Sequence, residues 1–148
     1  MKTSDIIWHN RFMDLTKQVA TWSKDPSTKV GAIIVDESNR IVSTGYNGAL
    51  PHIDDEFALE TKGNKYLFTV HAEQNAVMSA VKGKLNLENC RIYVTNSCCS
   101  ECAKMITHSG IISTVITLKD ADDTFRDRWN SEQADKLFKH SNIKQIQL

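Results

Sequence analysis

The sequence predicts an α/β domain with a mostly parallel β-sheet and helices on both of its faces. Two observations support this fold class. Short apolar runs alternate with segments of helical periodicity along the second half of the chain, and strands that alternate with helices usually form parallel pairs. The length of 148 residues suits one domain with its own core, so we expect a single domain over residues 1–148.

The first part of the chain is expected to form a helix and a β-hairpin. Residues 5–23 place apolar side chains at helical spacing, and Ser4 or Asp5 is a suitable N-cap. Residues 30–35 are a continuous apolar run, which is typical of a buried central strand. After a turn, a partner strand is expected at residues 40–46.

Residues 47–70 form the least regular stretch, where only a short helix near residues 54–61 is expected. Beyond this stretch, helices and strands alternate to the end of the sequence. The expected helices are residues 71–82, 99–108 and 131–140, and the expected strands are residues 90–95, 115–118 and 143–146.

The bulk properties disfavour several classes of partner. The chain has 18 basic and 18 acidic residues, so no overall field attracts nucleic acid, and no nucleic-acid partner is expected. No apolar run approaches the length of a membrane span or of a signal peptide. We therefore expect a cytoplasmic protein, or one of the host cytoplasm if the source is viral, without membrane contact. In that reducing compartment, three cysteines within residues 98–102 favour a metal site over disulfides.

Two short motifs indicate a catalytic zinc site. His71 and Glu73 form an H-x-E motif, and Cys99 and Cys102 form a C-x-x-C motif. One imidazole and two thiolates give zinc three protein ligands and leave a fourth position for water, which is a catalytic arrangement. Both motifs fall at predicted helix N-termini, whose partial positive charge favours the thiolate. Glu73 is then the group that moves protons and does not bind the metal.

Two other interpretations of the cysteines stay open. A C-x-x-C motif can be redox-active, although such a site needs no H-x-E motif. Cys98 could also supply a fourth ligand and close a structural site of three cysteines and one histidine. Against this, two adjacent cysteines rarely reach one tetrahedral ion without backbone strain. Cys98 also stands where the deaminase signature has a proline.

With these residues placed, the chain resembles the cytidine deaminase superfamily and, within it, the deoxycytidylate (dCMP) deaminases. The resemblance runs from about Asp25 to Ile143. It is carried by Val30-Gly31-Ala32-Ile33-Ile34-Val35, Gly45-Tyr46-Asn47-Gly48, His71-Ala72-Glu73-Gln74-Asn75-Ala76 and Cys99-Ser100-Glu101-Cys102-Ala103-Lys104. It implies a three-layer α-β-α fold of the cytidine deaminase type, with a five-stranded mixed sheet and helices on both faces.

The resemblance also implies the chemistry. His71, Cys99 and Cys102 would hold one catalytic Zn²⁺ per chain, and Glu73 would be the catalytic proton carrier. The implied reaction is the hydrolytic deamination of dCMP to dUMP and ammonia, which supplies dUMP for dTMP synthesis.

Further residues take their roles from the same resemblance. Asn47 would contact the deoxyribose, and the backbone of Ala72 and of Ser97 would contact the polar edge of the pyrimidine. Lys82 stands eleven residues after His71, where some viral members carry an arginine that discriminates between nucleotides. Lys82 is thus the candidate allosteric residue.

A nucleotide substrate needs cations for its phosphate. The candidates are Lys24, Lys29, Arg126 and Arg128, of which Lys29 and Arg126 are the expected substrate contacts. Each taken singly also fits a solvated surface charge. Residues 124–129 mix basic and aromatic groups, which suits nucleotide binding or a subunit interface.

Regulation and assembly are implied by the resemblance alone. Many members are hexamers that dCTP activates and dTTP inhibits, with Mg²⁺ accompanying the triphosphate. A second, structural zinc is not expected, because residues 49–70 contain no cysteine and His52 alone cannot rebuild that site.

Two alternative classes of function remain. One is another deaminase, acting on dCTP, cytidine or tRNA adenosine. The other is a zinc-stabilised module that is not an enzyme. Glu73 argues against the second, since a structural site has no use for a carboxylate beside an open metal position.

Overall fold

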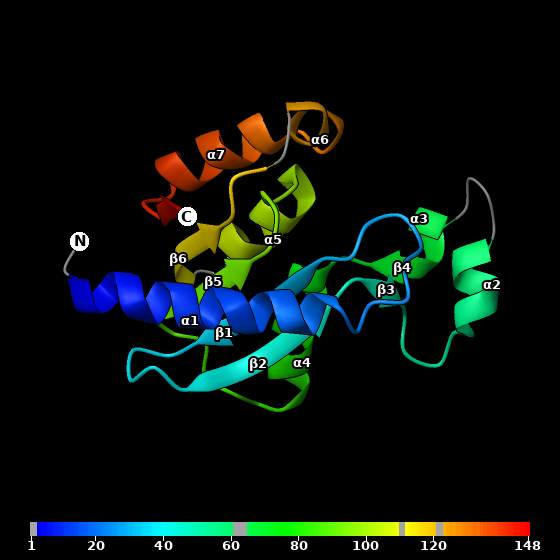
Figure 1. Cartoon of the computed structure of the whole chain (residues 1–148), viewed down its shortest axis with the longest axis horizontal. Coiled ribbons are helices and arrows are strands. Elements are labelled where there is room, and N and C mark those ends of the chain that lie inside the picture. The colour runs from blue at the N-terminus through cyan, green and yellow to red at the C-terminus, as the bar shows by residue number, and fades with distance from the viewer. Residues whose placement is uncertain (1–2, 61–64, 110–111, 121–122) are drawn as a thin grey trace.

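A five-stranded sheet forms the middle layer of the protein (Figure 1). The computed structural model describes residues 3–60, 65–109, 112–120 and 123–148. In spatial order the strands are β2 (Ile41–Tyr46), β1 (Gly31–Val35), β5 (Cys90–Val94), β6 (Ile112–Thr117) and β7 (Lys144–Gln147). The expected mixed sheet of five strands with helices on both faces is confirmed.

The strand directions correct the expectation of a mostly parallel sheet. β1 pairs antiparallel with both β2 and β5, whereas β5, β6 and β7 are parallel to one another. The reason lies in the connection from β2 to β5. These two strands run in the same direction but lie on opposite sides of β1, so the crossover between them skips a strand. β1 therefore has an antiparallel neighbour on each side.

Helices cover both faces of the sheet. The helix α1 (Thr3–Ala20) lies on one face, and α4 (Ala72–Lys82), α5 (Ser100–Ser109) and α7 (Ser131–His140) lie on the other. Side chains of β1 alternate between the two: Ile33 and Val35 pack towards α1, and Ala32 and Ile34 pack towards α4. Burial on both sides explains the continuous apolar run that predicted this strand.

The helix ends differ from the predictions mainly at α1. Ser4 and Asp5 lie inside the helix instead of capping it, so the N-cap prediction is wrong, and α1 ends at Ala20. The predicted bounds of α7 are confirmed, and His71 immediately precedes α4 as its N-cap. None of the helices in the described ranges has both the length and the apolar character needed to cross a bilayer.

The irregular stretch before α4 contains short elements. They are β3 (Gly48–Ala49), α2 (Asp55–Glu60), α3 (Lys65–Phe68) and β4 (Thr69–Val70), with β3 and β4 paired antiparallel. Only α2 was predicted. A similarly short helix, α6 (Asp123–Arg128), precedes α7. Two-residue strands and single-turn helices are too short to show a periodicity in the sequence.

Candidate active site

The two motifs meet where α4 and α5 begin. His71 precedes α4, Cys99 precedes α5, and Cys102 lies in the first turn of α5. Nδ1 of His71 is 3.4 Å from Sγ of Cys99 and 3.5 Å from Sγ of Cys102. The N–H of His71 donates to Oε1 of Gln74 at 3.0 Å, which fixes the backbone that carries the imidazole.

The three ligand atoms lie within 4.8 Å of one another, close enough to bind one metal ion. One imidazole nitrogen and two sulfurs are a donor set that suits zinc. Cys98 is buried but lies outside this group in the described part of the chain, so the closed four-ligand alternative gains no support.

The two cysteine thiols of this group differ in their pKa values. Hydrogen bonds from the Cys102 thiol, the His71 ring and the Cys102 backbone lower the pKa of Cys99 to about 4, although burial opposes this. The pKa of Cys102 is raised well above its ordinary value, because its thiol is hydrogen-bonded to Cys99 and is buried. Cys99 is therefore a thiolate at neutral pH, ready to bind a cation.

Glu73 lies beside this group and is withdrawn from solvent. Its side chain is only 4% exposed, and burial raises the pKa of its carboxyl above the ordinary value. A raised pKa makes a carboxylate a better proton acceptor, as a group that takes a proton from water must be.

A cavity of about 120 Å³ opens next to His71, Glu73 and Cys99. Four further residues predicted from the sequence line it, namely Asn47, Ala72, Ser97 and Arg128. As far as the structure describes its walls, Lys24, Lys29, Arg126 and Lys82 are not among them. The predicted base and sugar contacts are thus brought together, whereas most of the predicted phosphate contacts are not.

Asn47 is held rigidly at the cavity wall. Its Oδ1 accepts a hydrogen bond from the N–H of Val30 at 2.7 Å. Its amide nitrogen donates to the carbonyl oxygen of Thr28 at 2.8 Å and to Oδ2 of Asp25 at 3.3 Å. Both N–H groups are used, so Asn47 can offer a ligand only the second lone pair of Oδ1.

Arg126 lies behind the loop that carries Ser97. Its guanidinium donates to Oγ of Ser97 at 2.8 Å and pairs with Asp135 and with Asp120, the latter at 3.6 Å. The N–H of Ser97 donates to Oδ1 of Asp120 at 3.0 Å, so its carbonyl is the backbone group left for a base. The structure thus gives Arg126 a supporting position in a neighbouring cavity.

Aromatic side chains that the sequence did not identify individually cover the metal end. The ring of Trp129 meets the ring of His71 edge to face at a centroid distance of 5.1 Å, and Tyr66 meets Trp129 at 5.5 Å. Phe125 also lines the cavity. The mixture of basic and aromatic residues at 124–129 was the only signal for this wall.

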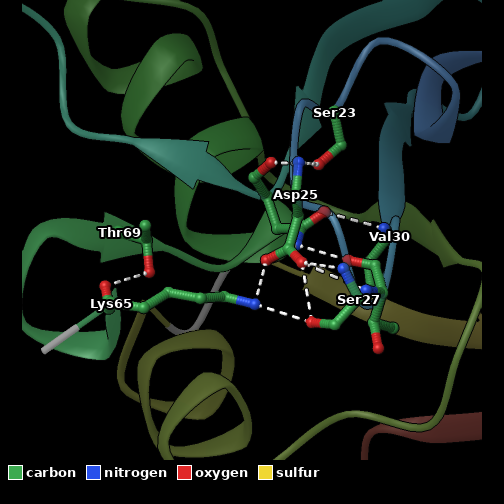
Figure 2. A network of polar contacts seen from close by, with 8 residues as sticks. Ser23, Asp25, Ser27, Val30, Lys65 and Thr69 are labelled. Carbon is green, nitrogen blue, oxygen red and sulfur yellow. Dashed lines mark hydrogen bonds and ion pairs between the residues drawn. The ribbon is translucent and has the colours of Figure 1, made fainter. Parts of the chain in front are cut away.

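Lys65 is a charged lining residue that the sequence analysis did not identify. Its Nζ lies 2.5 Å from Oδ2 of Asp25 and donates to Oγ of Ser27 at 2.8 Å (Figure 2). Lys65 lies in the irregular stretch and pairs with a residue far away in the sequence, so no local pattern indicated it.

A group of three metal ligands beside a buried carboxyl, on a sheet with helices on both faces, is the arrangement of a zinc-dependent deaminase. Such an enzyme is a hydrolase. Comparison with known families specifies the class further. The model of the cytidine and deoxycytidylate deaminase zinc-binding region matches residues 6–119. The chain belongs to this family.

Individual relatives agree with this assignment. An uncharacterised deaminase from the luxG 3′ region of Aliivibrio fischeri is 42% identical over 125 residues, covering 84% of this chain and 81% of the relative. The deoxycytidylate deaminase of Mus musculus is 35% identical over 142 residues, covering 92% of this chain and 76% of the relative. The crystal structure of apo dCMP deaminase from the cyanophage S-TIM5 has the same fold, with a TM-score of 0.76, 22% identity and full coverage of both chains.

Proposed function

We propose that this protein hydrolyses dCMP to dUMP and ammonia, with zinc held by His71, Cys99 and Cys102. The observation that carries the proposal is the buried Glu73 carboxyl beside the three-ligand group, in one cavity. The choice of dCMP is supported by the name of the mouse relative and by a structure of the cyanophage enzyme in complex with dCMP and dUMP.

Zinc and Glu73 have different roles in the proposed reaction. Zinc, when bound, lowers the pKa of water and so supplies a nucleophile at neutral pH. Glu73 takes one proton from the water that attacks C4 and delivers it to N3 of the cytosine ring. It then takes the second proton of that oxygen and delivers it to the amino group, which leaves as ammonia when the bond between C4 and the amino nitrogen breaks. Its raised pKa suits both transfers.

The cavity walls orient the nucleotide. The backbone of Ala72 and the carbonyl of Ser97 contact the polar edge of the pyrimidine. Oδ1 of Asn47 accepts a hydrogen bond from a sugar hydroxyl, since both N–H groups of Asn47 are already used. Arg128, which has no ion-pair partner among the described residues, is available for phosphate at the same cavity.

Assembly and regulation form a second part of the proposal. We propose a cytoplasmic hexamer of single-domain subunits that dCTP with Mg²⁺ activates and dTTP inhibits, feeding dTMP synthesis. An exposed apolar surface on and after α4, formed by Met78, Val81 and Leu85, supports self-association. Lys82 is exposed on the same helix and outside the cavity lining, where an effector could reach it. Light scattering tests the assembly, and turnover of dCMP with and without dCTP, dTTP and Mg²⁺ tests the regulation.

A substrate panel tests the activity. Ammonia release is measured with dCMP, dCTP, deoxycytidine and cytidine, each with and without a zinc chelator. We expect dCMP to be preferred and the chelator to abolish turnover. Glu73→Gln keeps the shape of the side chain and removes its proton transfer, so it should retain zinc and lose about 100-fold to 10,000-fold in kcat. Near-normal turnover by a zinc-loaded Glu73→Gln variant would contradict the mechanism.

A further inference from the structure

Lys65 is a largely buried cation in the wall of the substrate cavity. Its side chain is 16% exposed, and its ion-pair partner Asp25 is 4% exposed. Among the described lining residues, Lys65 and Arg128 are the lysine and arginine side chains of this cavity. Burying an ammonium group is costly unless it is paired, and Asp25 supplies that pairing.

The carboxylate of Asp25 does not depend on Lys65 alone. Its Oδ1 accepts hydrogen bonds from the N–H and the hydroxyl of Ser27, both at 2.8 Å, and from the N–H of Thr28 at 3.1 Å. Its Oδ2 accepts from the amide of Asn47. These four neutral donors share the stabilisation of the negative charge with Lys65.

The ammonium group of Lys65 retains a donor for a ligand. A lysine has three N–H groups, and two of them are directed to Asp25 and to the hydroxyl of Ser27 (Figure 2). Among the residues that the structure describes, no oxygen or nitrogen accepts a hydrogen bond from the third, and the ring of Tyr66 lies 5.4 Å from the ammonium nitrogen, so this N–H is left for a molecule in the cavity. Ser27 and Arg128 line the same cavity.

Lys65 lies where the phosphate end of a bound nucleotide is expected. Oδ2 of Asp25 contacts both Asn47 and Lys65, so these two side chains are neighbours. With the base at His71 and the sugar at Asn47, the next group of the substrate is the 5′-phosphate. We propose that Lys65, held in place by Asp25, binds this phosphate and selects a nucleoside monophosphate over the nucleoside. The inference rests on the proposed deamination.

The experiment compares Lys65→Met and Lys65→Arg with the wild-type enzyme. Two measurements are made: kcat/KM for dCMP and deoxycytidine, and calorimetric affinity for dUMP and deoxyuridine. Since Lys65→Met removes a hydrogen bond to a charged group, it should lower kcat/KM for dCMP and affinity for dUMP about tenfold to 100-fold. The values for deoxycytidine and deoxyuridine should stay unchanged, and Lys65→Arg should keep most of the preference for phosphate.

Lys24→Met is the matched control. Lys24 also pairs with an aspartate at 2.5 Å, Asp55, but it is exposed and lies outside the cavity lining. We expect Lys24→Met to leave both substrates unaffected. If Lys65→Met does not fold, Lys65→Gln, which removes the positive charge but keeps a hydrogen-bond donor for Asp25, takes its place in the same comparison.

The outcomes separate this inference from the proposed function. An equal loss for the phosphorylated and unphosphorylated compounds would make Lys65 a structural anchor of α3 and overturn the inference. Equal wild-type affinity for dUMP and deoxyuridine would overturn it as well. If zinc-loaded wild-type protein turned over neither substrate but bound dUMP through Lys65, the proposed reaction would fail and the phosphate site would stand.

Discussion

Asp25 is the residue on which the polar end of the cavity depends. It holds Lys65, orients Asn47 and closes the turn at Ser27 and Thr28. Burial alone would raise the pKa of its carboxyl. Hydrogen bonds from Lys65, Thr28 and Ser27 outweigh burial, so the pKa lies below the ordinary value of 3.8. The folded state therefore favours the ionised carboxylate.

The lowered pKa of Asp25 predicts how stability depends on pH. The stabilisation from the carboxylate is fully present above its unfolded-state pKa of 3.8, and it is lost as the pH falls through the lower folded-state value. At pH 7, Asp25→Asn should reduce the free energy of unfolding by about 2 kcal/mol, as expected for a charged hydrogen-bond acceptor.

Urea titrations at pH 7, 5 and 3, with chelator throughout, would measure this difference. The gap between wild type and Asp25→Asn should be similar at pH 7 and 5 and smaller at pH 3. A gap that widened towards low pH would show that the carboxylate is not the stabilising form.

Individual site residues differ in how far the sequence reveals them. His71, Glu73, Cys99 and Cys102 could be predicted, because each motif is local and each falls at a helix start. Lys65 could not, since its pairing with Asp25 exists only after the irregular stretch has folded over the cavity. The charge of Arg126 could not show whether its side chain faces the substrate cavity or supports the Ser97 loop from the neighbouring one.

At the scale of elements, the contact between α4 and β2 positions the catalytic helix. A Cβ atom at Gly45 would lie 2.3 Å from both the carbonyl oxygen of Ala72 and the backbone nitrogen of Ala76. Only glycine lets the start of α4 approach β2 this closely. The same helix start carries His71 and Glu73.

Gly45→Ala should therefore move α4 and disturb the metal site. The backbone atoms that it meets belong to a helix and cannot turn aside, so we expect a destabilisation of about 1–3 kcal/mol or more. Zinc affinity should fall as well. Gly48→Ala is the control, because its nearest atoms are 3.8 Å away and belong to the side chain of Tyr46. Equal thermal stability of the two variants would contradict this account of the packing.

The long elements of the fold could be predicted and the short ones could not. The helix α7 has enough residues for a clear helical periodicity, whereas β1 was marked by its continuous apolar run and β2 by its place after a turn. The elements α3, β3, β4 and α6 are set by tertiary contacts instead. Strand direction was also beyond local patterns, because a crossover that skips β1 looks the same in sequence as one between neighbours.

At the scale of the whole molecule, the three metal-binding side chains connect the starts of two packed helices, α4 and α5. His71 belongs to the start of α4, whereas Cys99 and Cys102 belong to the start of α5. A ligand that binds only the folded state stabilises it by mass action, by about 4 kcal/mol at a free concentration 1,000 times its Kd. Zinc should therefore raise the melting temperature, and chelation should lower it.

Calorimetry over a series of free zinc concentrations measures this linkage. The melting temperature should rise with zinc in the wild type and much less in Cys102→Ser, which lacks one ligand. A wild-type melting temperature that did not respond to zinc would show that the three side chains do not bind the metal in the folded protein.

The position of Trp129 gives the protein a built-in optical probe. The chain has three tryptophans, and two of them, Trp8 and Trp22, are 38% and 51% exposed. The indole of Trp129 instead stands against the imidazole of His71. In a Trp8→Phe/Trp22→Phe background, the remaining tryptophan fluorescence would come from the cavity wall alone. Metal loading and nucleotide entry could then be followed in real time without any label.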